Sequence, residues 1–255
     1  MPNAPHPHRS GVGPSSALLA LAVLLPLASA AAQDPLFVGS SEGAGFGPSG
    51  VASGDLNGDG HMDLAASTRF SSTVEILLGL GDGTFAPPVP HFVGFQPTAV
   101  VLADLDGDGL LDLATSDAGS STVSALRGLG DGTFAPLSIT PVGSQPLDLA
   151  AGDMDGDGDV DLVVAHDSVL TPVTLLRGDG NGAFPASDLI GSDFCSRAVA
   201  VSDLDGDGSL EILVADVTNE SLRQFGSGSG TFAETAAHAV GLDPADVAIG
   251  DLDGD

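Results

Sequence analysis

The chain has 255 residues, with 35 Asp and Glu against only six basic residues, all of them arginine, so its formal net charge is −29. This charge excludes nucleic acids and anionic membranes as natural partners, because both select for clustered Lys and Arg. Cations are the expected counter-species. Since 42% of the residues are hydrophobic and 36 are glycine, the composition favours a folded, turn-rich β protein over an acidic disordered tail.

The N-terminus has the features of an export signal. Arg9 precedes the apolar run at residues 17–27, and small residues follow it, with cleavage options after Ala30 or Ala32. The stretch from 17 to 32 contains Pro26 and is shorter than the ~20 residues that cross a bilayer. We therefore expect residues 1–32 to be a signal peptide without a membrane span. The mature chain, 33–255, is then expected to be secreted or held at the cell surface.

The rest of the chain repeats one unit of about 49 residues. An acidic segment recurs at intervals of 49, 49, 50 and 48 residues, and a Gly-x-Gly-x-Phe marker recurs at intervals of 49, 50 and 48. The acidic segments begin at Asp55, Asp104, Asp153, Asp203 and Asp251, and the markers end at Phe85, Phe134, Phe184 and Phe232. Two independent markers that keep one period indicate a structural repeat.

Each unit contains four short apolar runs between turn residues, and no window has helical periodicity. In the second unit the runs are 99–102, 111–115, 121–126 and 133–135. This pattern predicts an all-β fold, a β-propeller of four-stranded blades. The sequence ends inside the fifth copy, so we expect four whole blades, a partial fifth and a C-terminally incomplete propeller. Phe37 has the spacing of an outer strand, and residues 35–40 are therefore expected to complete the last blade.

The acidic segments have the pattern of a calcium loop, with oxygen-bearing side chains at positions 1, 3, 5 and 9, Gly at 6 and a main-chain carbonyl available at 7. Calcium takes six to eight such oxygen ligands, whereas magnesium needs a stricter octahedron. We expect about one Ca²⁺ per complete repeat, four in all. The predicted metal residues are Asp55, Asn57, Asp59, His61 and Asp63 in loop 1; Asp104, Asp106, Asp108, Leu110 and Asp112 in loop 2; Asp153, Asp155, Asp157, Asp159 and Asp161 in loop 3; Asp203, Asp205, Asp207, Ser209 and Glu211 in loop 4; and Asp251, Asp253 and Asp255 in the incomplete fifth.

These loops are not EF-hands. An EF-hand needs a Glu at position 12 and flanking helices. Position 12 here falls inside strand-like runs, at Ala66, Thr115, Val164 and Val214. The loops are therefore expected to lie within β-hairpins.

The D-x-[DN]-x-D-G-x-x-D loop, the period and the Gly-Asp-Gly-Thr-Phe marker resemble the FG-GAP or VCBS repeats of integrin α-subunit-type β-propellers. The resemblance covers roughly residues 35–255. It implies a seven-bladed ring, with calcium in blade hairpins on one face and partner-binding loops often on the other. The sequence departs from the family pattern at two points. Position 9 of loop 4 is a Glu, Glu211, and the fifth copy lacks its second half.

The sequence offers little for catalysis. It contains no nucleophile, zinc or phosphate-loop motif, its paired carboxylates belong to the acidic loops, and His166 occupies a variable repeat position that we expect to be solvated. We therefore predict a protein that is not an enzyme. The absence of Trp and Tyr argues against a stacked sugar-binding platform, and the periodic Phe residues are expected in the blade core.

The function that follows is an exported calcium-binding propeller that acts in adhesion or in binding a protein or other ligand, with calcium in a structural role. Its partner would be an extracellular protein or glycan. The alternative is a non-catalytic propeller appended to an exported enzyme whose catalytic domain lies beyond residue 255.

Overall fold

The structure is a computed structural model that describes residues 46–227 and 231–251. These residues contain β-strands and no helix, so no helix in this part of the chain could span a membrane. The predicted signal peptide, the predicted outer strand at 35–40, and Asp253 and Asp255 lie outside the described residues.

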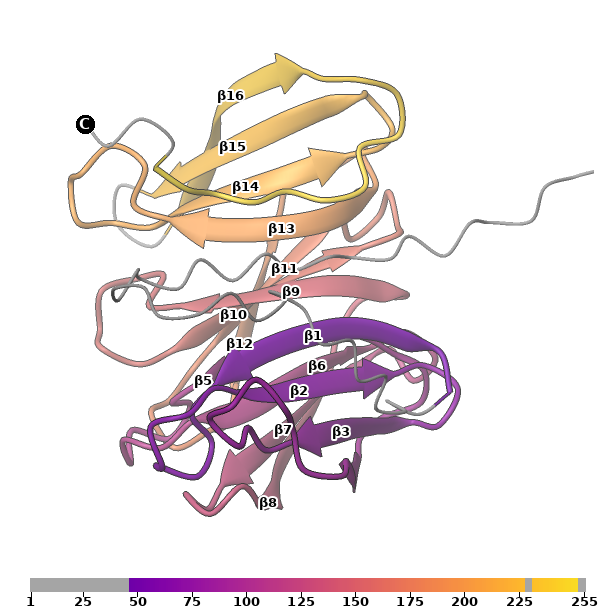
Figure 1. The fold of residues 1–255 in the computed structure, drawn as a ribbon. Coiled ribbons are helices and arrows are strands. Elements are labelled where there is room, and N and C mark those ends of the chain that lie inside the picture. Colours follow the sequence, from indigo (N-terminus) through magenta and orange to yellow (C-terminus); the bar gives the residue numbers. More distant parts are fainter. Residues whose placement is uncertain (1–45, 228–230, 252–255) are drawn as a thin grey trace, which may run out of the picture. The chain divides into compact units, whose positions relative to one another are not determined.

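The strands form four antiparallel sheets of four strands each, in chain order. Figure 1 shows the sheets following one another from β1–β4 in indigo to β13–β16 in yellow. The predicted all-β fold of four-stranded blades is confirmed. Blade 1 is β1 (Pro48–Gly54), β2 (Asp63–Thr68), β3 (Thr73–Leu77) and β4 (Val89–Phe92); blade 2 is β5 (Pro97–Ala103), β6 (Asp112–Asp117), β7 (Thr122–Gly128) and β8 (Phe134–Pro141); blade 3 is β9 (Pro146–Gly152), β10 (Asp161–His166), β11 (Val173–Arg177) and β12 (Ala186–Ile190); blade 4 is β13 (Ser196–Ser202), β14 (Glu211–Asp216), β15 (Ser221–Ser227) and β16 (Phe232–Ala239).

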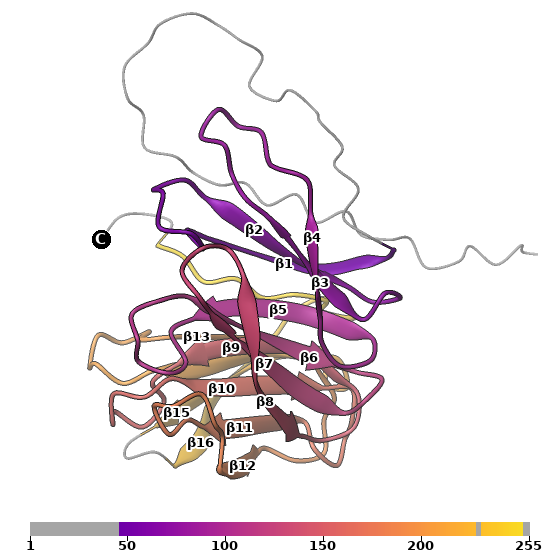
Figure 2. The same cartoon turned by 90° about the horizontal axis from the view of Figure 1, so that it is seen from below.

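The first strand of each blade lies innermost, and the inner strands of successive blades are neighbours (Figure 2). The Oγ of Ser49 donates to the carbonyl of Pro97 at 2.8 Å, and the Oγ1 of Thr98 donates to the carbonyl of Pro146 at 3.0 Å. A cavity of about 440 Å³ is lined by residues of all four inner strands. The blades therefore share an axis, and the sheets of the described residues do not close into a ring.

The hydrophobic core lies between the faces of adjacent blades. Between blades 1 and 2, Val74 and Ile76 pack with Val100 and Leu113, and similar clusters lie between blades 2 and 3 and between blades 3 and 4. Each blade thus depends on its neighbour to bury its apolar face, as in other repeat architectures. Position 2 of an acidic loop contributes to each cluster, through Leu56, Leu105 and Met154.

The Gly-Asp-Gly-Thr-Phe marker forms the turn between the third and fourth strands. The Oδ1 of Asp82 accepts hydrogen bonds from the N–H and the hydroxyl of Thr84, and Asp131 does the same with Thr133. Such side-chain bonds to a nearby backbone favour a tight turn. The Phe that follows packs on an inter-blade cluster in blades 2, 3 and 4, as expected for the periodic residues.

The prediction that His166 is solvated is wrong. Its side chain is 0% exposed at the end of β10, and its Nε2 lies 2.9 Å from the Oγ1 of Thr174. The equivalent residues Thr68, Asp117 and Asp216 are also fully buried. The repeat position is variable in residue type but is buried in every blade.

Candidate metal centres in the acidic loops

Each acidic loop joins the inner strand of a blade to its second strand, as predicted. In loop 2 the backbone reverses through Gly107, with φ at 72°, and Gly109, with φ at 86°. These are left-handed conformations that glycine adopts without the strain of a Cβ atom. The loop can therefore be tight enough to bring alternate side chains together.

Backbone N–H groups hold the carboxylates at positions 1 and 5. In loop 2, the N–H of Gly109 donates to the Oδ2 of Asp104 at 2.9 Å, and the N–H of Leu110 donates to the Oδ1 of Asp108 at 2.9 Å. The same two bonds are present in loops 1, 3 and 4. In loop 1, backbone hydrogen bonds of this kind lower the pKa of Asp55, and the bond from Gly60 has the largest effect. The loop backbone therefore fixes the directions of these carboxylates, and in loop 1 it favours the charged form of Asp55.

Position 9 is buried and joins the acidic loop to another part of its blade. One oxygen of Asp112 accepts the N–H of Leu105, at position 2 of the loop, and the other accepts the N–H of Gly128, at the end of β7, each at 2.8 Å. Asp63 and Asp161 make the corresponding pairs of bonds. Burial raises the pKa of Asp112 and of Asp161, and these hydrogen bonds oppose the rise.

The glycines that donate to position 9 are structural residues that the sequence analysis missed. A Cβ atom on Gly79, Gly128 or Gly178 would lie 2.3, 2.1 or 2.3 Å from a backbone carbonyl oxygen of the acidic loop. Only glycine allows this approach. The signal was present in the sequence, since these glycines follow position 9 by 16, 16 and 17 residues.

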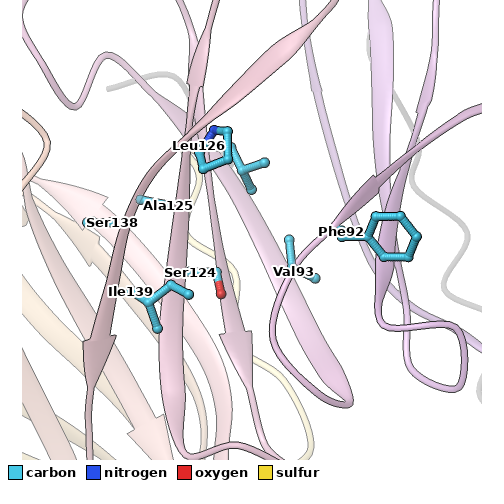
Figure 3. Close-up of a pocket in the computed structure, with 8 residues that line it drawn as sticks. Phe92, Val93, Ser124, Ala125, Leu126, Ser138 and Ile139 are labelled. Atoms are coloured by element: carbon cyan, nitrogen blue, oxygen red, sulfur yellow. The ribbon is translucent and has the colours of Figure 1, made fainter.

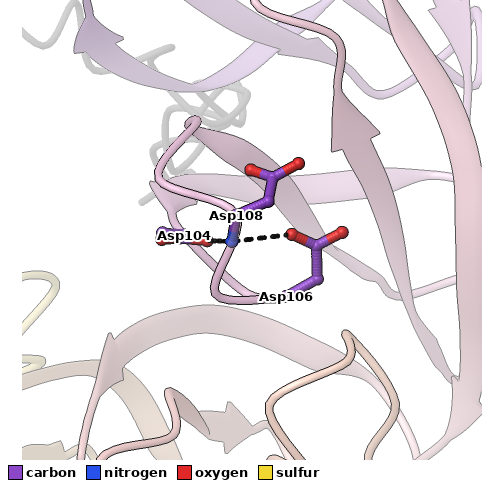
Figure 4. A group of neighbouring side chains, drawn as sticks. All are labelled: Asp104, Asp106 and Asp108. Atoms are coloured by element: carbon purple, nitrogen blue, oxygen red, sulfur yellow. Dashed lines mark hydrogen bonds between the residues drawn. The ribbon is translucent and has the colours of Figure 1, made fainter.

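The loops bring three carboxylates together in blades 2, 3 and 4. Figure 4 shows Asp104, Asp106 and Asp108 on one short loop, with the N–H of Asp108 bonded to the other two side chains. In each group the candidate ligand atoms lie within 4.8 Å of one another. The groups are Asp104, Asp106 and Asp108; Asp153, Asp155 and Asp161; and Asp203, Asp205 and Glu211.

These groups fit a calcium ion. Oxygen ligands bind calcium at ~2.3–2.6 Å, so two ligands of one ion can be up to ~5 Å apart, and the observed separations fall within that limit. The three groups together use positions 1, 3, 5 and 9, which are the predicted side-chain ligands. A single oxygen can accept a hydrogen bond and still offer a lone pair, so the position 9 carboxylate is available as well.

Other predicted ligands are placed differently. In loop 1, Asn57 replaces one carboxylate, and its amide donates to Asp59 at 2.9 Å. The position 7 side chains His61, Leu110 and Asp159 lie against a glycine of the marker turn, which leaves only the carbonyl for a metal at that position. Of the fifth copy, only Asp251 is described, and it is exposed.

Glu211, at position 9 of loop 4, makes the same hydrogen bond within the loop as the Asp residues at position 9 of the other loops. Its Oε2 accepts the N–H of Leu204 at 2.8 Å, and its side chain is 5% exposed. The longer side chain thus reproduces the bond that Asp makes in the other loops. Leu204, in contrast, is 39% exposed, whereas position 2 of loops 1, 2 and 3 is buried between blades.

An apolar groove lies between blades 1 and 2. Its cavity of about 430 Å³ is lined by residues of β7 and β8 and by Phe92 and Val93. Figure 3 shows Val93 on one side of the groove, Ser124 and Ile139 on the other, and Phe92 at its outer end. The groove offers apolar contact area without a cluster of titratable groups, so it is a candidate for binding rather than chemistry.

Comparison with known protein families agrees with these observations. A family described as FG-GAP-like repeat matches residues 55–115, 104–164 and 153–214, each match running from one acidic loop through the next. The chain belongs to this family. FG-GAP repeats form β-propeller-like modules that generally bind proteins and often bind calcium. No curated protein matches the chain.

Several solved structures have a similar fold. BBS1N in complex with ARL6DN has a TM-score of 0.55 and 18% identity, over 83% of this chain and 61% of that chain. A protein of Bacteroides uniformis ATCC 8492, proposed to be a 6-phosphogluconolactonase, has a TM-score of 0.58 and 11% identity, over 76% and 55%. A functionally unknown protein of Desulfotomaculum acetoxidans DSM 771 has a TM-score of 0.57 and 14% identity, over 79% and 60%. The chain therefore spans less than two thirds of each, and the likeness concerns the fold alone.

Proposed function

We propose that this chain is an exported propeller module that binds calcium in its acidic loops and a protein partner on the opposite face. The observation that carries the calcium proposal is the convergence of three carboxylates, held by backbone N–H groups, in each of three loops. Two carboxylates ~4 Å apart repel by ~4 kcal/mol at an effective dielectric of 20. A divalent cation relieves this repulsion.

The role proposed for calcium is structural. In loops 1, 2 and 3, position 9 ties the loop to its own blade, and position 2 ties it to the core between blades. Fixing the loop therefore stabilises both the hairpin and the contact with the next blade. Free calcium at ~100 times the dissociation constant stabilises a fold by ~2.7 kcal/mol per site, provided that the unfolded chain does not bind it.

The first test is thermal unfolding of the protein in excess EDTA and then across a calcium titration, with the bound metal counted. We expect the melting temperature to rise with calcium and about four ions to bind per chain. A magnesium titration serves as a control and should have a weaker effect. An unchanged melting temperature with no bound metal would contradict the proposal.

The partner is proposed to bind the face opposite the acidic loops. Exposed Phe side chains gather at the end of the blades that topology places there. Phe46 and Phe95 precede the first strand of a blade, Phe70 lies between the second and third strands, and Phe92 ends β4. Phe46, Phe70, Phe92 and Phe95 are 80%, 71%, 81% and 57% exposed. The N–H of Phe70 bonds to the carbonyl of Phe46 at 3.3 Å, so these two connections are adjacent. Large exposed apolar groups of this kind are typical of protein-binding surfaces.

Binding of the protein to arrays of extracellular proteins and of glycans tests this face. The double substitution Phe70→Ser and Phe92→Ser should abolish binding to a protein spot. The substitution Leu80→Ser, at an exposed apolar position of the turn between β3 and β4 on the acidic-loop side, is the control and should leave binding unchanged. Equal binding by both variants, or binding to glycan spots alone, would contradict a protein partner on this face.

Export and the absence of catalysis are parts of the same proposal. Export is supported by the sequence of residues 1–32 and is tested by mass spectrometry of the protein recovered outside the cell. The mature protein should begin at residue 31 or 33. A protein retained inside the cell with its first residues intact would contradict export. A non-catalytic role is supported by the position of the three acidic clusters found among the described residues, all of which lie in the acidic loops.

A further inference from the structure

An arginine from the third strand lies beside the acidic loop in blades 2 and 3. The Nη1 of Arg127, in β7, lies 3.6 Å from the Oδ2 of Asp106 at position 3 of loop 2. The Nη1 of Arg177, in β11, donates directly to the Oδ2 of Asp155 at position 3 of loop 3. Both arginines therefore contact one of the carboxylates assigned above to a cation.

The two arginines occupy equivalent positions, and the other two blades have no cation there. Strand pairing places Arg127 opposite Ala135 and Arg177 opposite Ala186. The equivalent residue of blade 1 is Leu78, whose carbonyl accepts the N–H of Ala86, and that of blade 4 is Gly226, opposite Ala233. The molecule thus contains loops with and without an arginine on otherwise similar scaffolds.

The two arginines are not held equally. The Nε of Arg177 also donates to the Oδ2 of Asp188 in β12 at 2.9 Å, and the side chain of Arg177 is 21% exposed. Arg127 has a longer contact with Asp106 and is 49% exposed. A guanidinium held by two carboxylates and partly shielded from water interacts more strongly than an exposed one.

We propose that Arg177 is an internal counter-ion of loop 3, which neutralises Asp155 in the cation-free protein and competes with calcium for this carboxylate. Arg127 does the same in loop 2, more weakly. The proposal rests on the calcium-binding role proposed above. It makes the loops unequal, because calcium entering loop 3 has to displace or face a positive charge that is absent from loops 1 and 4.

The competition follows from geometry and charge. A calcium ion needs the carboxylate oxygen at ~2.3–2.6 Å, and the Oδ2 of Asp155 already accepts a charge-assisted hydrogen bond. When calcium binds this oxygen, Asp155 loses its bond to Arg177, and the calcium ion is repelled by the positive charge of the arginine. In return, the arginine relieves repulsion among the carboxylates when no calcium is present, so loop 3 stays ordered at low calcium.

The test uses the full chain and the substitution Arg177→Gln. Removing the charge should tighten calcium binding at one site by up to about fivefold, as expected for the loss of a partly screened ion pair. The same variant should melt at a lower temperature than the parent in EDTA, and at the same or a higher temperature in saturating calcium. Calcium affinities are measured by competition with a chromophoric chelator, and melting by circular dichroism.

Arg69→Gln is the matched control, since Arg69 is an exposed residue of the turn between β2 and β3 and the substitution changes the net charge equally. It should leave every calcium affinity unchanged. Arg127→Gln is a second variant at an exposed position, which should fold and should tighten one site by a smaller factor.

The outcomes separate the two proposals. A parent protein that binds no calcium would overturn both. Calcium binding by the parent, with affinities unchanged in Arg177→Gln and Arg127→Gln, would overturn only the role of the arginines. A melting temperature lowered equally in EDTA and in calcium would also overturn it, because that is the behaviour of an arginine with a purely structural role.

Discussion

Asp112 and Gly128 join acidic loop 2 to the end of β7, through a hydrogen bond of 2.8 Å between residues 16 positions apart. The second oxygen of Asp112 accepts the N–H of Leu105 within the loop. The side chain is 0% exposed, so both backbone donors depend on this one carboxylate. Position 9 therefore has a structural role of its own, separate from any cation.

The substitution Asp112→Asn should destabilise the protein with or without calcium. Asparagine has the same shape, but its amide group would face one backbone N–H, and a buried donor left without an acceptor costs about 1–3 kcal/mol. Chemical denaturation in EDTA measures the loss. Unchanged stability in EDTA would show that the buried hydrogen bonds of Asp112 do not stabilise the loop.

The substitution Asp108→Asn should have the opposite dependence on calcium. Asp108 is exposed and accepts one N–H within its own loop, so its substitution should change the free energy of unfolding in EDTA by no more than about 0.5 kcal/mol. In calcium the variant should lose stability relative to the parent, because one ligand has lost its charge. Equal calcium-induced shifts of the melting temperature in the variant and the parent would exclude Asp108 as a ligand.

The sequence predicted the parts of this molecule that repeat, and missed those that depend on contacts between distant residues. The period, the strands around each loop and the convergence of positions 1, 3, 5 and 9 follow from local spacing. The burial of His166 does not, because it results from the packing of connections over the end of β10. The contacts of Arg127 and Arg177 depend on strand register, which places the end of the third strand beside a loop some 20 residues away. Phe46 and Phe95 are 49 residues apart and so keep the repeat period, but spacing alone does not distinguish an exposed Phe from a core one.

The substitution Gly128→Ala tests the close approach of the third strand to the loop. A Cβ atom at this position would lie 2.1 Å from the carbonyl oxygen of Leu111, so the strand or the loop would have to move, with the loss of the bond to Asp112. We expect destabilisation of about 2 kcal/mol or more. Gly241→Ala is the control, because nothing lies within 4 Å of its Cβ position. Equal stability of the two variants in urea denaturation would contradict this account.

The buried His166 and the half-buried Asp148, both in blade 3, should respond to pH in opposite ways. Burial lowers the pKa of His166 from 6.5 to about 4, so its contribution to stability is present above pH 6.5 and is lost as the pH falls towards 4. Burial raises the pKa of Asp148 from 3.8 to about 6, although its oxygens accept the N–H groups of Leu149 and Val199. Its contribution is present below pH 3.8 and is lost as the pH rises through 6.

In the parent, the two groups change the free energy of unfolding with pH in opposite directions, so their effects cancel between about pH 4 and 6. Single substitutions should therefore reveal each pH dependence separately. Each shift of about two pKa units corresponds to about 3 kcal/mol. His166→Gln leaves the Asp148 contribution, so the stability of this variant relative to the parent should fall as the pH rises. Asp148→Asn leaves the His166 contribution, so its relative stability should rise with pH. Urea denaturation in EDTA across this range gives both differences, because the three proteins have identical acidic loops. Parallel stability curves for the parent and both variants would show that neither group changes its pKa on folding.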